Sequence, residues 1–474
     1  MKQLPIIFLL LPLCLKPDLQ AQEIPLSSGF ETGRIMDTVL CTHSPGQSYA
    51  LFLPEEYTPQ RSWPILYIYD PAARASLALR RFQAGAEQLN WILACSNNSR
   101  NGPWEDILAA ADAVLLDTQE KLSVDLEQIY TAGFSGGSRA AMGIAVITGR
   151  VSGVIGCGAV FSSVEAYRPG PETAKFLYVG MVGLKDMNYL EHLNARAQLE
   201  GLGIENHLIL FDAGHEWPPS DRIARGMQWL ALKRQARGKA VDSTLLEHYR
   251  QAVEEDATGF FEDGYPVAAV SLLESLKSDF GDLLETKPID TRIRQITGEK
   301  PYQQQLKAIR KINDKESALQ QKYISAFVEL YWTINGSALS TSQEEWWEVQ
   351  INHLKRQTKD KDKLNSNSAY RLLNLISARS AESCFEFLSR NNYPLALALN
   401  ELWLKVSPED VYANWHMAKI HALMSNKNQA LNYLEKAVAY GMQYVKSLRA
   451  PEFELLEGEE RYEKLIRLVE RRED

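Results

Sequence analysis

The sequence lacks the features that mark proteins that bind nucleic acid or span a membrane. Lysine and arginine form no basic cluster, and the formal net charge is −9. The chain therefore has no general attraction for nucleic acid or anionic lipid. After the first residues no apolar run reaches 18 uninterrupted residues, the minimum for an ordinary membrane-spanning helix. We therefore expect no nucleic-acid partner and no membrane span.

Cysteine is also scarce, with five residues in 474. The cysteines form no CxxC pair and no spacing typical of metal ligands, which excludes the common zinc and redox motifs. Cys95 and Cys157 lie in apolar, strand-like runs, where a thiol behaves as a small buried hydrophobe. The sequence therefore predicts no metal site and leaves the disulfide state open.

The first residues predict an export signal. A short basic start precedes an apolar run over residues 4–15, and Ala21 is a small residue at a plausible cleavage point. This is the pattern of a secretory signal peptide, and the run is too short for a transmembrane helix. We expect residues 1–21 to be removed and the mature protein to be periplasmic or extracellular. Bulky Leu13 argues against a lipoprotein anchor at Cys14, because such sites usually have a small residue there.

Secondary-structure signals alternate between strand and helix in the first half of the chain. Short apolar runs bounded by turn residues indicate strands, and apolar residues at i, i+3, i+4 spacing indicate helices. The predicted strands are 48–53, 63–70, 91–96, 128–134, 152–161, 175–183 and 206–211. The predicted helices are 76–89, 105–122, 138–147, 188–203 and 222–235. This alternation predicts an α/β fold, a mostly parallel sheet with helices on both faces.

After about residue 240 the strand signals nearly vanish and helix follows helix. Two segments around Ala396 and Ala430 resemble each other and are 34 residues apart, which is the period of a tetratricopeptide repeat. Other residues that fit this pattern are Ala418, Ala437 and Pro408. An irregular helical domain is the alternative, and it stays open above all for residues 245–370.

The segment YTAGFSGGSRAAMG, residues 130–143, places Ser135 between glycines at a predicted strand-to-helix turn. Gly-x-Ser-x-Gly in this context is the nucleophile elbow, in which a strained turn exposes the serine hydroxyl at the carboxyl edge of the sheet. Gly133 and Gly137 keep side chains out of the turn. The backbone N–H of Gly136 opens the helix and is predicted to face a developing oxyanion. The motif therefore predicts a nucleophilic serine.

A serine hydroxyl needs a base to remove its proton, and the base is expected after the last strand with an acid after an earlier one. His215 follows the last predicted strand, and Asp186 follows the strand before it. We therefore predict a catalytic triad of Ser135, Asp186 and His215. The alternative acids are Asp212 and Asp221, and the histidines predicted to be structural are His192 and His207.

The second oxyanion donor is expected in the loop YDPAAR, which follows the second predicted strand. Pro71 has no N–H, which leaves Ala72 as the predicted donor and Ala73 as the alternative. Trp104 and Trp217 lie in loops at the same predicted edge of the sheet. They are candidates for substrate binding, with simple packing as the alternative.

These motifs resemble those of a known family. Residues from about 30 to 235 resemble an α/β-hydrolase of the secreted esterase and dienelactone-hydrolase-like group, through GFSGGSR, GLKDMNY, FDAGHEWPP and the loop SNNSRNGP. The resemblance implies hydrolysis by a Ser-Asp-His triad with no metal and no organic cofactor. It does not imply the substrate, because this fold hosts many chemistries. YDPAAR departs from the His-Gly pair of many relatives, and from about residue 370 the chain resembles a tetratricopeptide-repeat protein.

Together these features predict a secreted serine hydrolase that cleaves carboxylic esters, with a small-molecule or carbohydrate-linked ester as substrate. One alternative is a serine peptidase on the same fold. Another is a non-catalytic hydrolase-like protein whose helical repeats bind a protein or peptide partner. The predicted domains are a signal peptide (1–21), an α/β-hydrolase domain able to fold alone (22–240), a helical region (241–370) and tetratricopeptide-like repeats (371–474).

Overall fold

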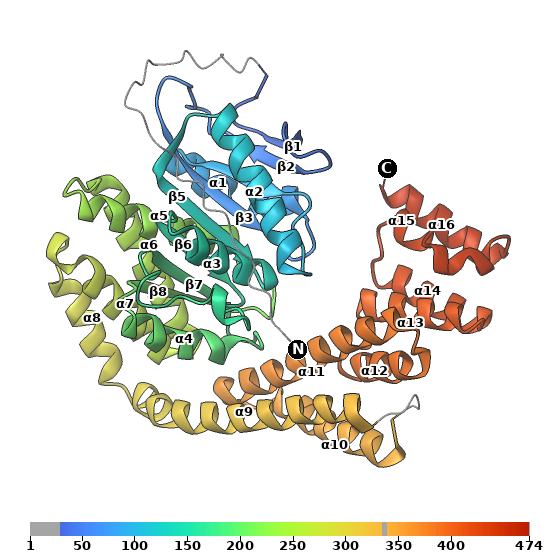
Figure 1. The fold of residues 1–474 in the computed structure, drawn as a ribbon. Helices are drawn as coiled ribbons and strands as arrows, with labels where there is room; N and C mark the ends of the chain where they lie inside the picture. Colours follow the sequence, from blue (N-terminus) through green and yellow to red (C-terminus); the bar gives the residue numbers. More distant parts are fainter. Residues whose placement is uncertain (1–28, 334–338, 474) are drawn as a thin grey trace, which may run out of the picture.

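The computed structural model describes residues 29–333 and 339–473. The predicted signal peptide, residues 1–21 with Cys14, lies outside the described residues. The described chain forms an α/β half followed by an extended array of helices (Figure 1). No helix in this described part combines the length and apolar character that crossing a membrane requires.

An eight-stranded sheet forms the centre of the α/β half. Its strands lie in the order β1-β2-β4-β3-β5-β6-β7-β8. The pairs β1–β2 and β2–β4 are antiparallel, and every other pair is parallel. The strands are β1 (Ile35–Leu40), β2 (Ser48–Phe52), β3 (Trp63–Tyr69), β4 (Ile92–Ser96), β5 (Val124–Phe134), β6 (Gly153–Cys157), β7 (Leu177–Gly183) and β8 (Asn206–Phe211). The sheet is mostly parallel, as predicted, and the α/β fold class is confirmed.

Helices cover both faces of the sheet, as the apolar runs of its strands require. Alternate residues of β3 enter opposite cores: Leu66 and Ile68 face one, and Ile65 and Tyr67 face the other. The first core is closed by α1 (Ala75–Leu89) and α5 (Ser220–Arg237). The second is closed by α2 (Trp104–Lys121), α3 (Gly136–Thr148) and α4 (Tyr189–Gly201).

The first core continues beyond the predicted domain boundary at residue 240. Apolar residues of α6 (Ser243–Glu262), α7 (Pro266–Phe280) and α8 (Lys287–Thr297) belong to the same buried cluster as α1 and α5. Fully buried Tyr249 comes from α6. Trp229 of α5 donates its ring N–H to Asp279 of α7 at 2.8 Å. Residue 240 therefore does not separate two cores, and α6 to α8 pack as part of the α/β half.

The remaining helices form two further cores. They are α9 (Lys300–Thr333), α10 (Thr341–Gln357), α11 (Lys363–Ser389), α12 (Tyr393–Val406), α13 (Val411–Leu423), α14 (Lys427–Ala439), α15 (Val445–Leu448) and α16 (Glu460–Glu473). α11 packs on α12 and α13 on α14 as helical hairpins. The alanines at 396, 418, 430 and 437 are all buried in these packings. Their assignment as tetratricopeptide repeats stays a prediction.

Candidate active site

Ser135 lies on a sharp turn between β5 and α3. Its φ of 53° and ψ of −119° are a strained conformation for a residue with a side chain. A Cβ on Gly133 would lie 2.1 Å from the Gly137 carbonyl oxygen, and one on Gly137 would lie 2.0 Å from that of Tyr69. The turn therefore admits only glycine two residues before and two residues after Ser135. The Ser135 N–H donates to the Cys157 carbonyl at 2.8 Å, which ties the turn to β6.

The structure brings together the three residues predicted for the triad. Ser135 Oγ lies 2.9 Å from Nε2 of His215, and Nδ1 of His215 lies 3.0 and 2.9 Å from the two carboxylate oxygens of Asp186. The Asp186 side chain is fully buried and that of His215 is one-fifth exposed. A serine, an imidazole and a buried carboxylate in this chain of hydrogen bonds can pass a proton from the serine to the imidazole.

Neighbouring groups hold this pair of base and acid in place. The backbone N–H of Asn188 donates to Asp186 at 2.8 Å, and the Asn188 side chain donates to the Gly158 carbonyl at 2.7 Å. The Phe134 ring lies against the imidazole of His215, with 4.8 Å between ring centroids. The rotamers of both catalytic candidates are therefore set by packing as well as by their mutual hydrogen bonds.

The alternative acids lie elsewhere. Asp212 is more than half exposed and pairs with Lys185 at 2.7 Å. Asp221 is also more than half exposed and lies in the first turn of α5 beside Arg222. Their carboxylates are thus solvated or used in surface pairs, whereas that of Asp186 is buried against the imidazole.

The structure does not leave Ala72 free as an oxyanion donor. Its N–H donates to the Asp70 carboxylate at 2.8 Å, and the N–H of the alternative, Ala73, donates to the Asp70 carbonyl at 3.1 Å. The prediction for Ala72 fails because the carboxylate and carbonyl of Asp70 accept the N–H groups of its own loop. Gly136 does lie at the cavity described below.

Asp70 also explains the position of Trp217. Asp70 is 1% exposed and accepts hydrogen bonds from Arg74 and from the ring N–H of Trp217, the latter at 3.0 Å. Burial raises the pKa of Asp70, but the bonds from Arg74 and Trp217 outweigh it and hold the pKa below its usual value. Trp217 is therefore a buried anchor two residues beyond His215, and it packs against Phe134 rather than lining the cavity.

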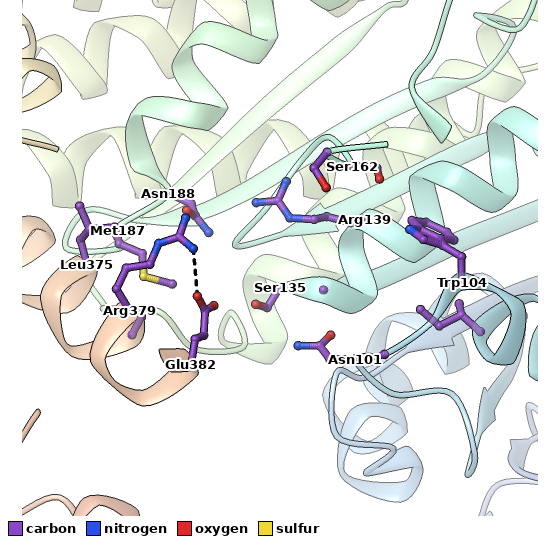
Figure 2. Close-up of a pocket in the computed structure, with 15 residues that line it drawn as sticks. Asn101, Trp104, Ser135, Arg139, Ser162, Met187, Asn188, Leu375, Arg379 and Glu382 are labelled. Atoms are coloured by element: carbon purple, nitrogen blue, oxygen red, sulfur yellow. Dashed lines mark hydrogen bonds and ion pairs between the residues drawn. The ribbon is translucent and has the colours of Figure 1, made fainter. Parts of the chain in front are cut away.

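A cavity of about 310 Å³ opens beside Ser135. The α/β half contributes Trp104, a predicted substrate-binding candidate, and the helical array contributes one face of α11 (Figure 2). The cavity lining also includes Asn101, Gly136, Arg139, Leu375, Arg379 and Glu382. Arg379 and Glu382 pair with each other at 3.1 Å across the α11 side of the cavity. The cavity is thus closed by residues more than 200 positions apart in the chain.

Asn101 is a candidate that the sequence did not single out. A Cβ on Gly136 would lie 1.8 Å from the Asn101 side-chain oxygen, so the amide packs directly on the oxyanion end of the elbow. Figure 2 shows the amide nitrogen turned toward the open side of the cavity, near Ser135. The signal in the sequence was weak: Asn101 belongs to SNNSRNGP, a loop with three asparagines and no fixed spacing to the serine.

Charged groups behind the cavity are paired. Arg139 makes a bidentate bond to Glu191 at 2.7 and 2.9 Å. Burial raises the pKa of Glu191, but Arg139 and the Val160 N–H lower it, and the net pKa is below the usual value. Next to this pair, His192 is 2% exposed, and burial lowers its pKa to about 4. His192 is therefore a neutral, structural histidine, as its place within a helix predicted.

Comparisons with known proteins find likeness only among solved structures. No protein-family model and no curated protein matches the sequence. The chain is similar to an S-formylglutathione hydrolase from Staphylococcus aureus, with a TM-score of 0.35 and 16% identity over 42% of this chain and 98% of that chain. It is also similar to fluorophosphonate-binding serine hydrolase F of the same organism, with a TM-score of 0.35 and 14% identity over 42% of this chain and 99% of that chain. A third similar structure is a ferulic acid esterase, with a TM-score of 0.35 and 14% identity over 41% of this chain and 94% of that chain. At these identities and TM-scores the likeness says nothing about the reaction.

The chemistry therefore rests on the side chains of this chain. The α11 residues at the cavity carry no motif, so nothing in the sequence linked them to a serine about 240 residues earlier. In the described residues, no three His, Cys, Asp or Glu side chains gather as metal ligands. The four described cysteines, Cys41, Cys95, Cys157 and Cys384, are free and buried.

Proposed function

We propose that this chain is an exported serine hydrolase that cleaves carboxylic esters through an acyl-enzyme on Ser135. The observation that carries the proposal is the hydrogen-bonded path from the Ser135 hydroxyl through His215 to the buried carboxylate of Asp186. That path starts on a strained elbow, which a folded protein maintains only where the surrounding structure demands it. Export is proposed from the signal-peptide pattern of residues 1–21.

In the proposed reaction, His215 Nε2 removes the proton from Ser135 Oγ while that oxygen attacks the ester carbonyl carbon. The tetrahedral intermediate collapses when the imidazolium returns the proton to the leaving alcohol. A water molecule, deprotonated by the same nitrogen, then attacks the acyl-serine. The bond between the acyl carbon and Ser135 Oγ breaks as the imidazolium returns that proton to Oγ, which releases the acid and free Ser135. Asp186 keeps the proton of the imidazole on Nδ1 and stabilises the imidazolium between the two transfers.

For the oxyanion we propose two donors, the backbone N–H of Gly136 and the side-chain amide of Asn101. The Gly136 N–H opens α3, where the helix dipole also favours negative charge. Asn101 packs on Gly136 through its amide oxygen, and both residues line the cavity beside Ser135, which supports the pairing. Figure 2 shows the amide nitrogen on the side of Ser135. A side-chain amide in this role is worth about 10²–10³-fold in kcat in subtilisin.

The cavity supports a compact, polar substrate. Its volume of about 310 Å³ is at the small end of ligand pockets. Amide, hydroxyl and guanidinium groups line it together with Trp104 and Leu375. We therefore propose a small or carbohydrate-linked ester, whose hydroxyls would meet these polar groups while its acyl group lies on the apolar ones.

The deciding experiment is covalent labelling with a fluorophosphonate, followed by assays on chromogenic esters of increasing acyl length and on peptide substrates. Ser135→Ala should abolish labelling and lower the esterase rate by about 10⁴-fold or more. Ser278→Ala, at an exposed serine of α7, should change neither. An unlabelled wild-type protein would favour the non-catalytic alternative, and faster cleavage of peptides than of esters would favour a peptidase.

Export has its own measurement. Mass spectrometry of protein recovered outside the cytoplasm should show a chain that begins near Gln22. A chain that retains residues 1–20, or a lipid on Cys14, would contradict the proposed processing.

A further inference from the structure

The loop that carries Asp186 is held from outside the α/β half. It joins β7 to α4, and three of its backbone carbonyls accept hydrogen bonds from side chains of the helical array. Arg371 donates to Leu184 at 2.7 Å and Asn374 donates to Lys185 at 2.8 Å, both from α11. The residue after the acid, Met187, accepts from Gln320 of α9 at 3.3 Å. The backbone on both sides of Asp186 is thus fixed by α9 and α11.

Arg371 is itself fixed by a buried ion pair. Its side chain is 4% exposed and that of Glu316, on α9, is fully buried. Two of its nitrogens bind the two carboxylate oxygens of Glu316, and the third reaches the Leu184 carbonyl. The guanidinium also stacks on the Tyr189 ring, 4.4 Å from its centroid, at the start of α4. A planar fork with three bonds in fixed directions is a rigid support that lysine could not reproduce.

The same face of α11 continues into the cavity. Positions 371, 374, 375, 378 and 382 follow an i, i+3, i+4, i+7, i+11 pattern, so their side chains lie along one side of the helix. The first two hold the Asp186 loop, and the later ones line the cavity beside Ser135. Figure 2 shows Leu375, Arg379 and Glu382 approaching the site from α11, opposite Asn101 and Trp104. One helix, α11, therefore contacts both the Asp186 loop and the cavity beside Ser135.

We propose that α11 is part of the catalytic apparatus, with Arg371 and Asn374 as positioning residues that hold the Asp186 loop in register with His215. This inference rests on the proposed hydrolase function. It assigns the helical array a role in the reaction itself, in place of an independent interaction module. A misplacement of about 1 Å in a catalytic group can cost about 100-fold in rate, so a loop held by three outside bonds is sensitive to losing one.

Asn374→Ala is the sharpest test, because Asn374 is only partly buried and its loss removes a single bond to the loop. Asn367→Ala is the matched control: it lies on the same helix, and its amide donates to the Tyr265 hydroxyl instead, at 3.0 Å. We expect Asn374→Ala to lower kcat on a small ester by about 10-fold to 100-fold with KM nearly unchanged. Fluorophosphonate labelling of Ser135 should slow in proportion. Asn367→Ala should keep the wild-type kcat.

The split between kcat and KM separates positioning from general destabilisation. A displaced Asp186 should slow the reaction of bound substrate, so Asn374→Ala should lower kcat at nearly unchanged KM and with a wild-type midpoint of urea unfolding, whereas Asn367→Ala should keep the wild-type kcat. Arg371→Lys keeps the charge but loses the planar fork, so it should also lower kcat.

Two results would overturn the inference: a wild-type kcat in Asn374→Ala, or an equal loss of kcat in Asn374→Ala and Asn367→Ala. If wild-type protein were not labelled at all, the proposed hydrolase function would fail first. Wild-type labelling with equal labelling of Asn374→Ala would leave that function standing and remove only the role of α11.

Discussion

His192 should make the stability of the α/β half sensitive to acid. It lies in α4, beside the Arg139–Glu191 pair, and neither of its ring nitrogens has a hydrogen-bond partner among the described residues. Burial lowers its pKa to about 4 from an ordinary value of 6.5. In the unfolded chain the His192 imidazole is exposed to water and can be protonated at its ordinary pKa.

The sign and size follow from the difference in proton binding. Between pH 6.5 and 4 the unfolded state binds a proton at His192 that the folded state does not, so the free energy of unfolding falls as the pH falls. Above pH 6.5 the His192 contribution to the free energy of unfolding is intact, and below about pH 4 it is fully lost. A depression from 6.5 to about 4 corresponds to about 3 kcal/mol in total. At pH 5 the loss should be about 2 kcal/mol.

The assay compares urea unfolding at pH 7.5 and pH 5 for wild type and His192→Leu. A chain with several cores need not unfold in one step. Residual labelling of Ser135 is therefore used to measure the folded fraction of the α/β half. The loss between the two pH values should be about 2 kcal/mol smaller in His192→Leu. His353→Leu, at an exposed histidine of α10, should keep the wild-type loss. Equal pH dependence in wild type and His192→Leu would refute the buried-histidine explanation.

Two further perturbations test other parts of the structure. Asn101→Ala should lower kcat by about 100-fold with little change in KM. Asn97→Ala, in the same loop but bonded to Ser48, should not, and equal kinetics in both would remove Asn101 from the oxyanion site. A fragment of residues 22–240 should aggregate rather than fold alone, because it exposes the apolar face of α5 that α6 and α7 cover. Gel filtration and circular dichroism check this, and a monomeric fragment with esterase activity would contradict it.

The α/β sheet and the Ser135–His215–Asp186 cluster were predictable because their signals are local. Buried parallel strands appear as short apolar runs, and the elbow needs glycine on both sides of Ser135 wherever it occurs. The strand β1 left no such signal, because an edge strand with mostly partly buried or exposed residues has no apolar run. The order of serine, acid and base along the chain then restricted the remaining candidates to a few residues.

The predictions that failed depended on contacts that no motif or apolar pattern signals. Ala72 was a sound expectation from its loop position, but whether an N–H is free depends on its neighbours, and Asp70 accepts it. The boundary near residue 240 followed the end of the strand signals, whereas the core follows apolar surface, and α6 and α7 supply more of it. The bonds from Arg371 and Asn374 to the Asp186 loop leave no pattern in the sequence, because backbone carbonyls accept them and every residue has one.

The hold of α11 on the acid loop also sets an order of assembly. Arg371 and Leu184 are 187 residues apart in sequence, so a nascent chain has made the elbow and the last strand long before the helix that secures Asp186 is synthesised. Contacts of such separation close late, after the local elements have formed. The α/β half would then pass through a stage in which Ser135 is exposed but the Asp186 loop is not yet held by α11. Full activity would appear only when the chain beyond residue 374 has docked.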